Sequence, residues 1–338
     1  MGFDCSKAVT PQERAICASP LLSSIDDQMT VAYKEALAGA PPDFKMQVRE
    51  DQRQWLSNRD VICPASRDPR ADSAMSDCLS GYENRRAELL RQLIQRKNGV
   101  LFVWRSVALS FHAMKHPDLG VEGDGYFETE AGSVLASWPQ AVSSSPEWQA
   151  WNRGIEEATR RIACGSPENK KVQVAWSPVC AKDAMNVINV MIDSLGEPLV
   201  AAEINREWYD RSEGSSGTDS FEFNWLFGEK REIRADDIFE ARSNWREVLL
   251  AAARKSLYDD GKPLFGDGLG DVETQIVLNP ENWYLRADAL VIGFPSAYAE
   301  CHACDSPAVS IPWEELKPYL NSSFPRVQRS ASEAEMAP

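Results

Sequence analysis

Hydrophobic residues recur every three or four positions through the first 97 residues, which is the spacing of one face of an α-helix. The segment Thr10-Pro11-Gln12-Glu13 predicts a helix start, because it combines a capping box with a proline at the first helical position. Ser19-Pro20 ends that helix and begins a second, which Gly39-Ala40-Pro41-Pro42 ends. We predict a third helix over about 43–61 and a fourth from about residue 72. Their hydrophobic faces are assigned to the core, with Leu22, Ile25, Met29, Val48, Trp55, Leu79, Tyr82 and Leu93 among the members.

From Gly99 onward the pattern becomes strand-like, with short apolar runs between turn residues. Strands are expected over 100–104, 107–111, 187–195, 199–208, 221–227, 283–285 and 289–294. Helices are expected over 148–162, 243–258 and 313–320. Because the strands follow one another as hairpins with a few helices between them, this part is predicted to be α+β with a mostly antiparallel sheet.

A length of 338 residues is about twice that of an ordinary domain, which favours two domains. The composition, 43% hydrophobic and 26% charged, excludes the disordered, collagenous and membrane classes. No apolar run approaches the ~20 residues that span a bilayer. We predict an all-α helical domain over 1–97, an α+β domain over 98–322 and a disordered tail over 323–338. Met1 is interpreted as a start residue placed on a mature chain whose export signal has been cut away.

The net charge of −15 lies entirely in the second part of the chain. Residues 1–97 hold 14 acidic and 14 basic side chains, whereas residues 98–338 hold 37 acidic and 22 basic ones. Such a field repels nucleic acid and anionic membrane and attracts basic proteins or cations. The alternative interpretation is that the charge serves solubility alone.

Eight cysteines fall into four close pairs, Cys5/Cys17, Cys63/Cys78, Cys164/Cys180 and Cys301/Cys304. Pairing within each neighbouring couple is the simplest connectivity, although eight cysteines allow about a hundred pairings. A zinc site is the alternative, but only Cys301-His302-Ala303-Cys304 supplies anything like its ligand spacing. We favour disulfides, and therefore an exported protein in an oxidising compartment.

The chain lacks a nucleophile elbow, a phosphate loop, a dinucleotide fingerprint and a zinc-protease helix motif. His112, His116 and His302 would form a metal site only by meeting Cys301 and Cys304; the alternative is a turn before Pro117 and a disulfide. Adjacent acidic residues are typical of helix starts or solvated faces, although one such pair would suit a glycoside hydrolase. These pairs are Glu156-Glu157, Asp236-Asp237, Asp259-Asp260 and Glu314-Glu315. We therefore predict no catalytic residue, metal or cofactor, and a protein that is not an enzyme.

Motifs at fixed spacing run through residues 3 to about 92. They are Phe3-Asp4-Cys5-Ser6-Lys7-Ala8, Glu13-x-x-Ile16-Cys17, Leu22-x-x-Ile25-Asp26, Tyr33, Gln52-x-x-Trp55-Leu56-x-x-Arg59-Asp60-x-x-Cys63 and Cys78-Leu79-x-x-Tyr82-x-x-Arg85. In this order they resemble the LprI-type lysozyme-inhibitor family of bacterial envelope proteins. The resemblance implies a small helical domain whose cysteines are oxidised. Independently of it, Arg59 and Asp60 could simply pair within a helical hairpin.

The second part resembles the lysozyme-binding ectodomain of RsiV-type anti-sigma factors. The resemblance is carried by a strand pair over 187–208 and then by Phe221-x-Phe223-Asn224-x-x-x-Gly228, Ile233-x-x-Asp236-Asp237-Ile238-Phe239, Leu290-Val291-Ile292-x-Phe294 and Val309-Ser310-Ile311-Pro312-Trp313-x-x-Leu316. In that family the loop before the isoleucine-proline step docks on lysozyme. The resemblance implies that the partner-binding residues of this chain lie in the corresponding loop. They would be Pro295, Ser296, Tyr298, His302 and Asp305. The Cys-x-x-Cys insertion in this loop departs from the family pattern.

Together the resemblances imply an exported protein of the periplasm or cell surface that binds and inhibits a lysozyme-like peptidoglycan hydrolase by occluding its cleft. The expected partner is a basic protein, with no nucleic acid, no membrane span and no signalling role. Two alternatives stay open. One is an immunity or assembly factor for another envelope enzyme, and the other is an envelope hydrolase with an unrecognised carboxylate pair.

Overall fold

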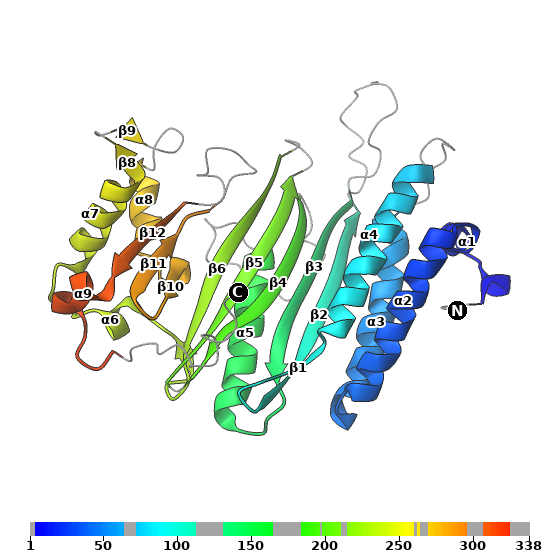
Figure 1. Ribbon diagram of the computed structural model, residues 1–338, viewed down its shortest axis with the longest axis horizontal. Helices are drawn as coiled ribbons and strands as arrows, with labels where there is room; N and C mark the ends of the chain where they lie inside the picture. The colour runs from blue at the N-terminus through cyan, green and yellow to red at the C-terminus, as the bar shows by residue number, and fades with distance from the viewer. Residues whose placement is uncertain are drawn as a thin grey trace, which may run out of the picture. The chain divides into compact units, whose positions relative to one another are not determined.

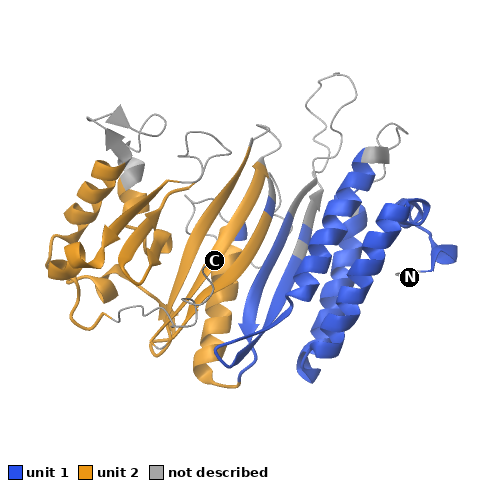
Figure 2. Cartoon of the chain, viewed as in Figure 1, with its two compact units in different colours: residues 1–143, 163–186 blue, residues 144–162, 187–338 orange. Residues whose placement is uncertain are grey.

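A computed structural model describes residues 4–63, 72–112, 131–164, 184–196, 198–210, 215–259, 262–263, 270–295 and 307–324. The chain divides into two compact units (Figure 2). Unit 1 comprises residues 1–143 and 163–186, and unit 2 comprises residues 144–162 and 187–338. Unit 1 therefore groups the helical region with the strands that follow it. The domain boundary after residue 97 stays a prediction.

Unit 1 begins with a helical region that confirms the four predicted helices (Figure 1). The predicted capping box starts the first of them: the amide of Glu13 donates to Thr10 Oγ1 at 3.2 Å, and the amide of Thr10 donates to Glu13 Oε2 at 2.9 Å. Ser19 Oγ accepts from the amide of Leu22 and caps the second helix. The elements are the 3₁₀ helix η1 (Cys5–Lys7) and the α-helices α1 (Pro11–Ala18), α2 (Pro20–Gly39), α3 (Pro42–Ile62) and α4 (Asp72–Arg91).

The four helices bury the hydrophobic faces that the sequence assigned to the core. Fully buried members are Ile16, Leu22, Val48 and Leu79, whereas in the fourth helix Leu90 is buried in addition to the predicted face. The disulfide Cys5–Cys17 joins η1 to α1, and Cys63–Cys78 joins the end of α3 to α4. Both pairings were predicted. Closing loops of 12 and 15 residues restricts the unfolded chain, which supports a core of modest size.

Three antiparallel strands follow the helices in the described part of unit 1. They are β1 (Ile94–Lys97), β2 (Val100–His112) and β3 (Ala131–Ala141). A two-residue turn of Asn98 and Gly99, with φ of 46° and 80°, joins the first two strands. Positive φ at both positions is the requirement of a tight hairpin, and Asn-Gly meets it. The two strands expected over 100–104 and 107–111 are one strand, because Arg105 and Ser106 continue the pairing with β3.

Unit 2 contains one long helix and an antiparallel meander, as the sequence predicted. The helix is α5 (Pro146–Cys164), and the strands are β4 (Ala184–Leu195), β5 (Leu199–Asp210), β6 (Ser215–Leu226) and β7 (Arg231–Glu232), in that spatial order. Strand β6 pairs with β5 along its whole length, from Leu199↔Leu226 to Asp210↔Ser215. Trp225 of β6 packs closely against Gly154 of α5.

The rest of unit 2 is a small α+β assembly around a three-stranded antiparallel sheet. Phe239 stacks on Trp245 with ring centroids 4.7 Å apart, and both contact Trp283 at the centre of this core. The elements are α6 (Ala235–Ile238), α7 (Trp245–Leu257), β8 (Tyr258–Asp259), β9 (Lys262–Pro263), α8 (Gly270–Val277), η4 (Pro280–Asn282), β10 (Trp283–Leu285), β11 (Ala289–Gly293), β12 (Ala308–Pro312), α9 (Trp313–Leu316) and η6 (Lys317–Tyr319).

The predicted fold class is confirmed: a helical N-terminal region with two disulfides precedes an α+β part with a mostly antiparallel sheet. Asp236 and Asp237 lie in the first turn of α6, where Asp237 Oδ2 accepts from the amide of Arg234 at 2.8 Å. This pair is therefore a helix start, as expected. Among the described α-helices and strands, those without a predicted counterpart are α8, β1, β3, β7, β8, β9 and β12.

Candidate functional site

The predicted docking loop is attached to the β11–β12 hairpin of unit 2. Gly293 pairs with Ala308, and the amide of Phe294 donates to the carbonyl oxygen of Pro307 at 3.0 Å. Pro295 follows directly and is half-buried. The other predicted contact residues lie outside the described part of the chain: Ser296, Tyr298, His302 and Asp305. The structure thus shows where the loop begins and ends, and its binding role stays a prediction.

The remaining predicted chemical sites are described only in part. Cys164 is disulfide-bonded, and its predicted partner Cys180 lies outside the described residues, as do Cys301 and Cys304. His116 is also outside them. Among the residues that the structure does describe, no helix is long and apolar enough to cross a membrane.

The motif residue Arg59 lies in a buried polar cluster rather than on an exposed surface. Arg59 is 5% exposed and Glu83 is 0% exposed. Arg59 Nε lies 3.3 Å from Asp60 Oδ1, and Arg59 Nη1 lies 3.5 Å from Glu83 Oε1. Burial and, to a smaller extent, the nearby Asp26 carboxylate raise the pKa of Glu83 to about 7, although Arg59 opposes both effects. Arg59 and Asp60 therefore pair within the helical hairpin.

A second buried cation fixes the helices to the first long strand. Arg86 Nε donates to Gln52 Oε1 at 2.9 Å, and Arg86 Nη1 donates to Ser106 Oγ of β2 at 3.2 Å. Its guanidinium carbon lies 6.0 Å from the ring centroid of Trp55, which stacks on Tyr82 at 4.8 Å. Burial lowers the pKa of Arg86 to about 10. These contacts give the motif residues Gln52, Trp55 and Tyr82 a structural role, because they hold the helices together and to β2.

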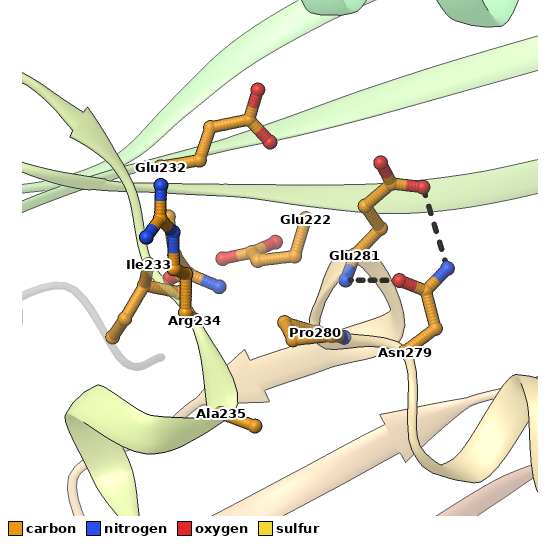
Figure 3. Close-up of a pocket in the computed structure, with 9 residues that line it drawn as sticks. Glu222, Glu232, Ile233, Arg234, Ala235, Asn279, Pro280 and Glu281 are labelled. Atoms are coloured by element: carbon orange, nitrogen blue, oxygen red, sulfur yellow. Dashed lines mark hydrogen bonds between the residues drawn. The ribbon is translucent and has the colours of Figure 1, made fainter. Parts of the chain in front are cut away.

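A pocket of about 330 Å³ in unit 2 collects carboxyl groups from separate segments (Figure 3). Arg161 of α5 joins two of them, donating to Glu232 Oε2 at 3.3 Å and lying 3.0 Å from Glu281 Oε1. Burial raises the pKa of Glu232, and Arg161 opposes that shift. The lining residues are Glu222 and Asn224 of β6, Glu232 of β7, Ile233, Arg234, Ala235 of α6, Asn279, and Pro280 and Glu281 of η4.

Glu222 is the most deeply buried carboxyl group of this pocket, at 4% exposure. Burial raises its pKa well above the usual range, and the charges of Asp193 and Glu203 act in the same direction. Arg286 opposes them, but its Nη1 is already held by Asp193 Oδ2 at 2.6 Å. Glu222 therefore keeps its proton at pH values where exposed glutamates are ionised.

Sequence reasoning did not single out the pocket. Its residues come from segments around positions 222–224, 232–235 and 279–281, which no fixed spacing connects. One signal was present in the sequence: Glu222 and Asn224 alternate with the aromatic residues Phe221, Phe223 and Trp225. That alternation is typical of a solvent-facing side. Here η4 and β10 cover that side, and Asn224 Nδ2 donates to the carbonyl oxygen of Trp283 at 2.8 Å.

Comparison with known proteins gives a family match for the helical region. Residues 5–90 match the family model described as lysozyme inhibitor LprI. This match spans η1 to α4 and both described disulfides, in agreement with the resemblance found from the motifs. A search of curated proteins found no match for the chain.

Two solved structures are similar to a larger share of the chain. A member of the DUF3298 family from Bacteroides fragilis is 17% identical, with a TM-score of 0.44, and covers 68% of this chain and 96% of its own. A DUF3298 family protein from Pseudomonas aeruginosa PAO1 is 12% identical, with a TM-score of 0.41, and covers 67% of this chain and 97% of its own. The relation of the second part to RsiV-type ectodomains stays a prediction.

Proposed function

We propose that the protein is a bacterial envelope protein that binds and inhibits a lysozyme-like peptidoglycan hydrolase by occluding its active-site cleft. The observation that carries this proposal is the match of residues 5–90 to a family described as a lysozyme inhibitor. The disulfides at Cys5–Cys17 and Cys63–Cys78 support export to an oxidising compartment, the periplasm or the cell surface.

The contact with the hydrolase is proposed to lie in the acidic second part, on the loop between β11 and β12. The motif residues of the helical region support this choice, because Gln52, Trp55 and Tyr82 are buried and unavailable to a partner. Charge supports it as well, since all of the net −15 falls after residue 97. A negative field attracts a basic hydrolase and raises its association rate.

Tyr298 is proposed as the anchor of this loop, because aromatic side chains supply much of the binding energy of protein interfaces. The paired backbone at Phe294 and Pro307 fixes both ends of the loop, which lowers the entropy lost on binding. Pro295, Ser296, His302 and Asp305 would surround the anchor.

A lysis assay on a cell-wall suspension tests the function. Inhibition of added lysozyme supports the proposal. No effect on any lysozyme type contradicts it and favours an immunity or assembly factor for another enzyme. Lysis without added lysozyme contradicts it and favours a hydrolase.

The contact itself is tested by titrating Tyr298→Ala against a lysozyme that the unmodified protein binds. We expect a loss of ~2 kcal/mol or more, mainly through faster dissociation. Tyr209→Ala is the matched control, because Tyr209 is a 39% exposed tyrosine of β5 in the same unit. Unchanged affinity of a folded Tyr298→Ala protein removes this loop from the interface.

A further inference from the structure

The two described disulfides differ in how deeply their cysteines are buried. Cys5 is exposed and Cys17 is half-buried, whereas Cys63 is 0% exposed and its partner Cys78 is half-buried. A thiolate must reach a sulfur atom to open a disulfide, so access to the cysteines decides whether exchange occurs in the folded protein. The Cys5–Cys17 disulfide is therefore the more accessible of the two.

Within the described part of the chain, the hydrogen bonds and ion pairs of residues 4–8 all stay inside that segment. The amide of Lys7 donates to the carbonyl oxygen of Asp4 at 2.9 Å, and the Ser6 hydroxyl group donates to Asp4 Oδ1 at 2.7 Å. The side chains of Lys7 and Asp4 are 79% and 56% exposed. Figure 1 shows this segment beyond α1, on the side away from α2, α3 and α4. The disulfide to Cys17 is therefore what holds the segment against α1.

Helix α1 is fixed to the rest of the helical region by contacts other than this disulfide. Ile16 is 1% exposed in the core of the helices. Gln12 is 4% exposed, and its Nε2 donates to the carbonyl oxygens of Cys63 at 2.9 Å and Asp60 at 3.2 Å, at the end of α3. Opening of the first disulfide leaves these contacts in place. It is expected to release the segment before α1 and to keep the four helices folded.

We propose that Cys5–Cys17 is a thiol–disulfide exchange site, at which a dithiol reductant releases residues 4–8 from α1 while the four helices stay folded. A dithiol suits this site because its second thiol completes the reduction that the first one begins. Exposed disulfides of this kind are more easily reduced than those that support a core. Exchange at this site does not depend on the proposed inhibition of a hydrolase.

The reaction balances with the dithiol as the one added reactant. A thiolate of the reagent attacks Sγ of the exposed Cys5, a mixed disulfide forms there, and Cys17 leaves as a thiolate. The second thiolate of the reagent then attacks the reagent's own sulfur in the mixed disulfide and releases Cys5. The protein gains two electrons and two protons, and the dithiol is oxidised to its intramolecular disulfide.

The same reaction is disfavoured at the second described disulfide. Attack at the half-buried Cys78 would make Cys63 the leaving group, and Cys63 is 0% exposed. A thiolate that forms inside an apolar core is poorly solvated, so the pKa of its thiol is raised and it leaves slowly. Cys63–Cys78 is therefore the internal control for exchange at Cys5–Cys17.

The test is a timed reduction of the whole protein by dithiothreitol, stopped with N-ethylmaleimide and followed by peptide mapping of each cysteine. We expect Cys5 and Cys17 to be labelled at least about tenfold faster than Cys63 and Cys78. The far-ultraviolet circular dichroism of the helices should be unchanged while the first pair alone is reduced. Equal labelling rates of the two pairs, or loss of the helical signal when the first pair opens, overturn the proposal.

Trypsin cleavage reports whether the segment is released. Lys7 lies in the segment, and Arg14 is an exposed residue of α1. After reduction of the first pair, cleavage after Lys7 should become at least about tenfold faster, because proteases cut segments that have lost their structure. Cleavage after Arg14 should not change, because α1 stays folded. Unchanged cleavage after Lys7, or an equal increase after Arg14, overturns the proposal.

A variant carrying both Cys5→Ser and Cys17→Ser gives the open state without a reductant. It should show the same fast cleavage after Lys7 and the same helical signal as the reduced protein. Its melting temperature should fall, because the unfolded chain is less restricted. The labelling experiment uses the unmodified protein, so a variant that fails to fold leaves the proposal open to contradiction by the labelling rates.

Discussion

Glu203 of β5 lies directly opposite Glu222 of β6 in the antiparallel register. Like charges at directly opposed positions destabilise a strand pair. The fold accommodates this pair because burial and the neighbouring negative charges raise the pKa of Glu222, which keeps it uncharged. The proton of Glu222 is therefore part of the folded structure, and its loss carries a cost in stability.

We predict that Glu222→Gln stabilises the protein increasingly as the pH rises. The folded pKa of Glu222 lies above its usual value of 4.5, so the unfolded chain loses this proton first. The contribution of Glu222 to the free energy of unfolding is fully present below about pH 4.5, and it is lost as the pH rises toward the pKa of the folded state. Glutamine does not ionise in either state, so the variant avoids this loss. Melting temperatures between pH 5 and pH 8 measure the effect, and a difference that does not grow with pH contradicts the assignment.

Gly154→Ala is expected to destabilise unit 2 by about 1–3 kcal/mol, because the added methyl group overlaps the Trp225 ring. A Cβ at this position would lie 2.7 Å from Trp225 Cη2. Gly81→Ala is the matched control on α4, where a Cβ meets nothing within 4 Å. It should stabilise by roughly 0.5–1 kcal/mol through helix propensity alone. Denaturant unfolding measures the free energy of unfolding of both variants. Equal changes in the two variants would show that the Trp225 ring moves aside without cost, and would contradict the prediction.

Peptide mapping under non-reducing conditions should find the linked pairs Cys164–Cys180 and Cys301–Cys304 in addition to the two described disulfides. The bonded state of Cys164 supports the first of these pairs. Close spacing supports the second. Free thiols at Cys301 and Cys304, or stoichiometric zinc, would instead support the metal alternative.

A fragment ending at Asn98 is expected to melt cooperatively as a helical protein and to weaken sharply on reduction, because two disulfides support its small core. It should be less stable than a fragment of residues 1–143. The shorter fragment lacks Ser106, so Arg86 Nη1 loses its partner on β2. Far-ultraviolet circular dichroism follows both melts. A molten signal from the oxidised short fragment would mean that the helices require the strands for a core.

The elements of this fold could be predicted from the sequence where local signals agree. The helix starts at Thr10 and Ser19 combine capping residues with proline, and both form as expected. Strand β3 was missed because Pro139 interrupts its apolar run, and proline usually argues against a strand interior. The break expected inside β2 was wrong, since its pairing partners on β3 continue through Arg105 and Ser106. Long-range pairing of this kind has no local signature.

The two candidate sites differ in how far the sequence reveals them. The docking loop is continuous in the chain, so a family pattern could indicate it. The pocket exists only after folding, because β6, β7, α6 and η4 each contribute one or two side chains. The protonation state of Glu222 could not be inferred either, since its pKa depends first on burial in the folded protein and then on the charges of Asp193 and Glu203 from other strands.

The closed base of the β11–β12 hairpin has a consequence for how recognition could change over time. The amide of Phe294 donates to the carbonyl oxygen of Pro307, and the strands on both sides of the connecting segment place Ile292, Phe294 and Val309 in the described core. Doubling the length of a flexible connection costs only about 0.6 kcal/mol in closure entropy. A binding segment closed at its base in this way can change in length and sequence at little cost to the core that both flanking strands share.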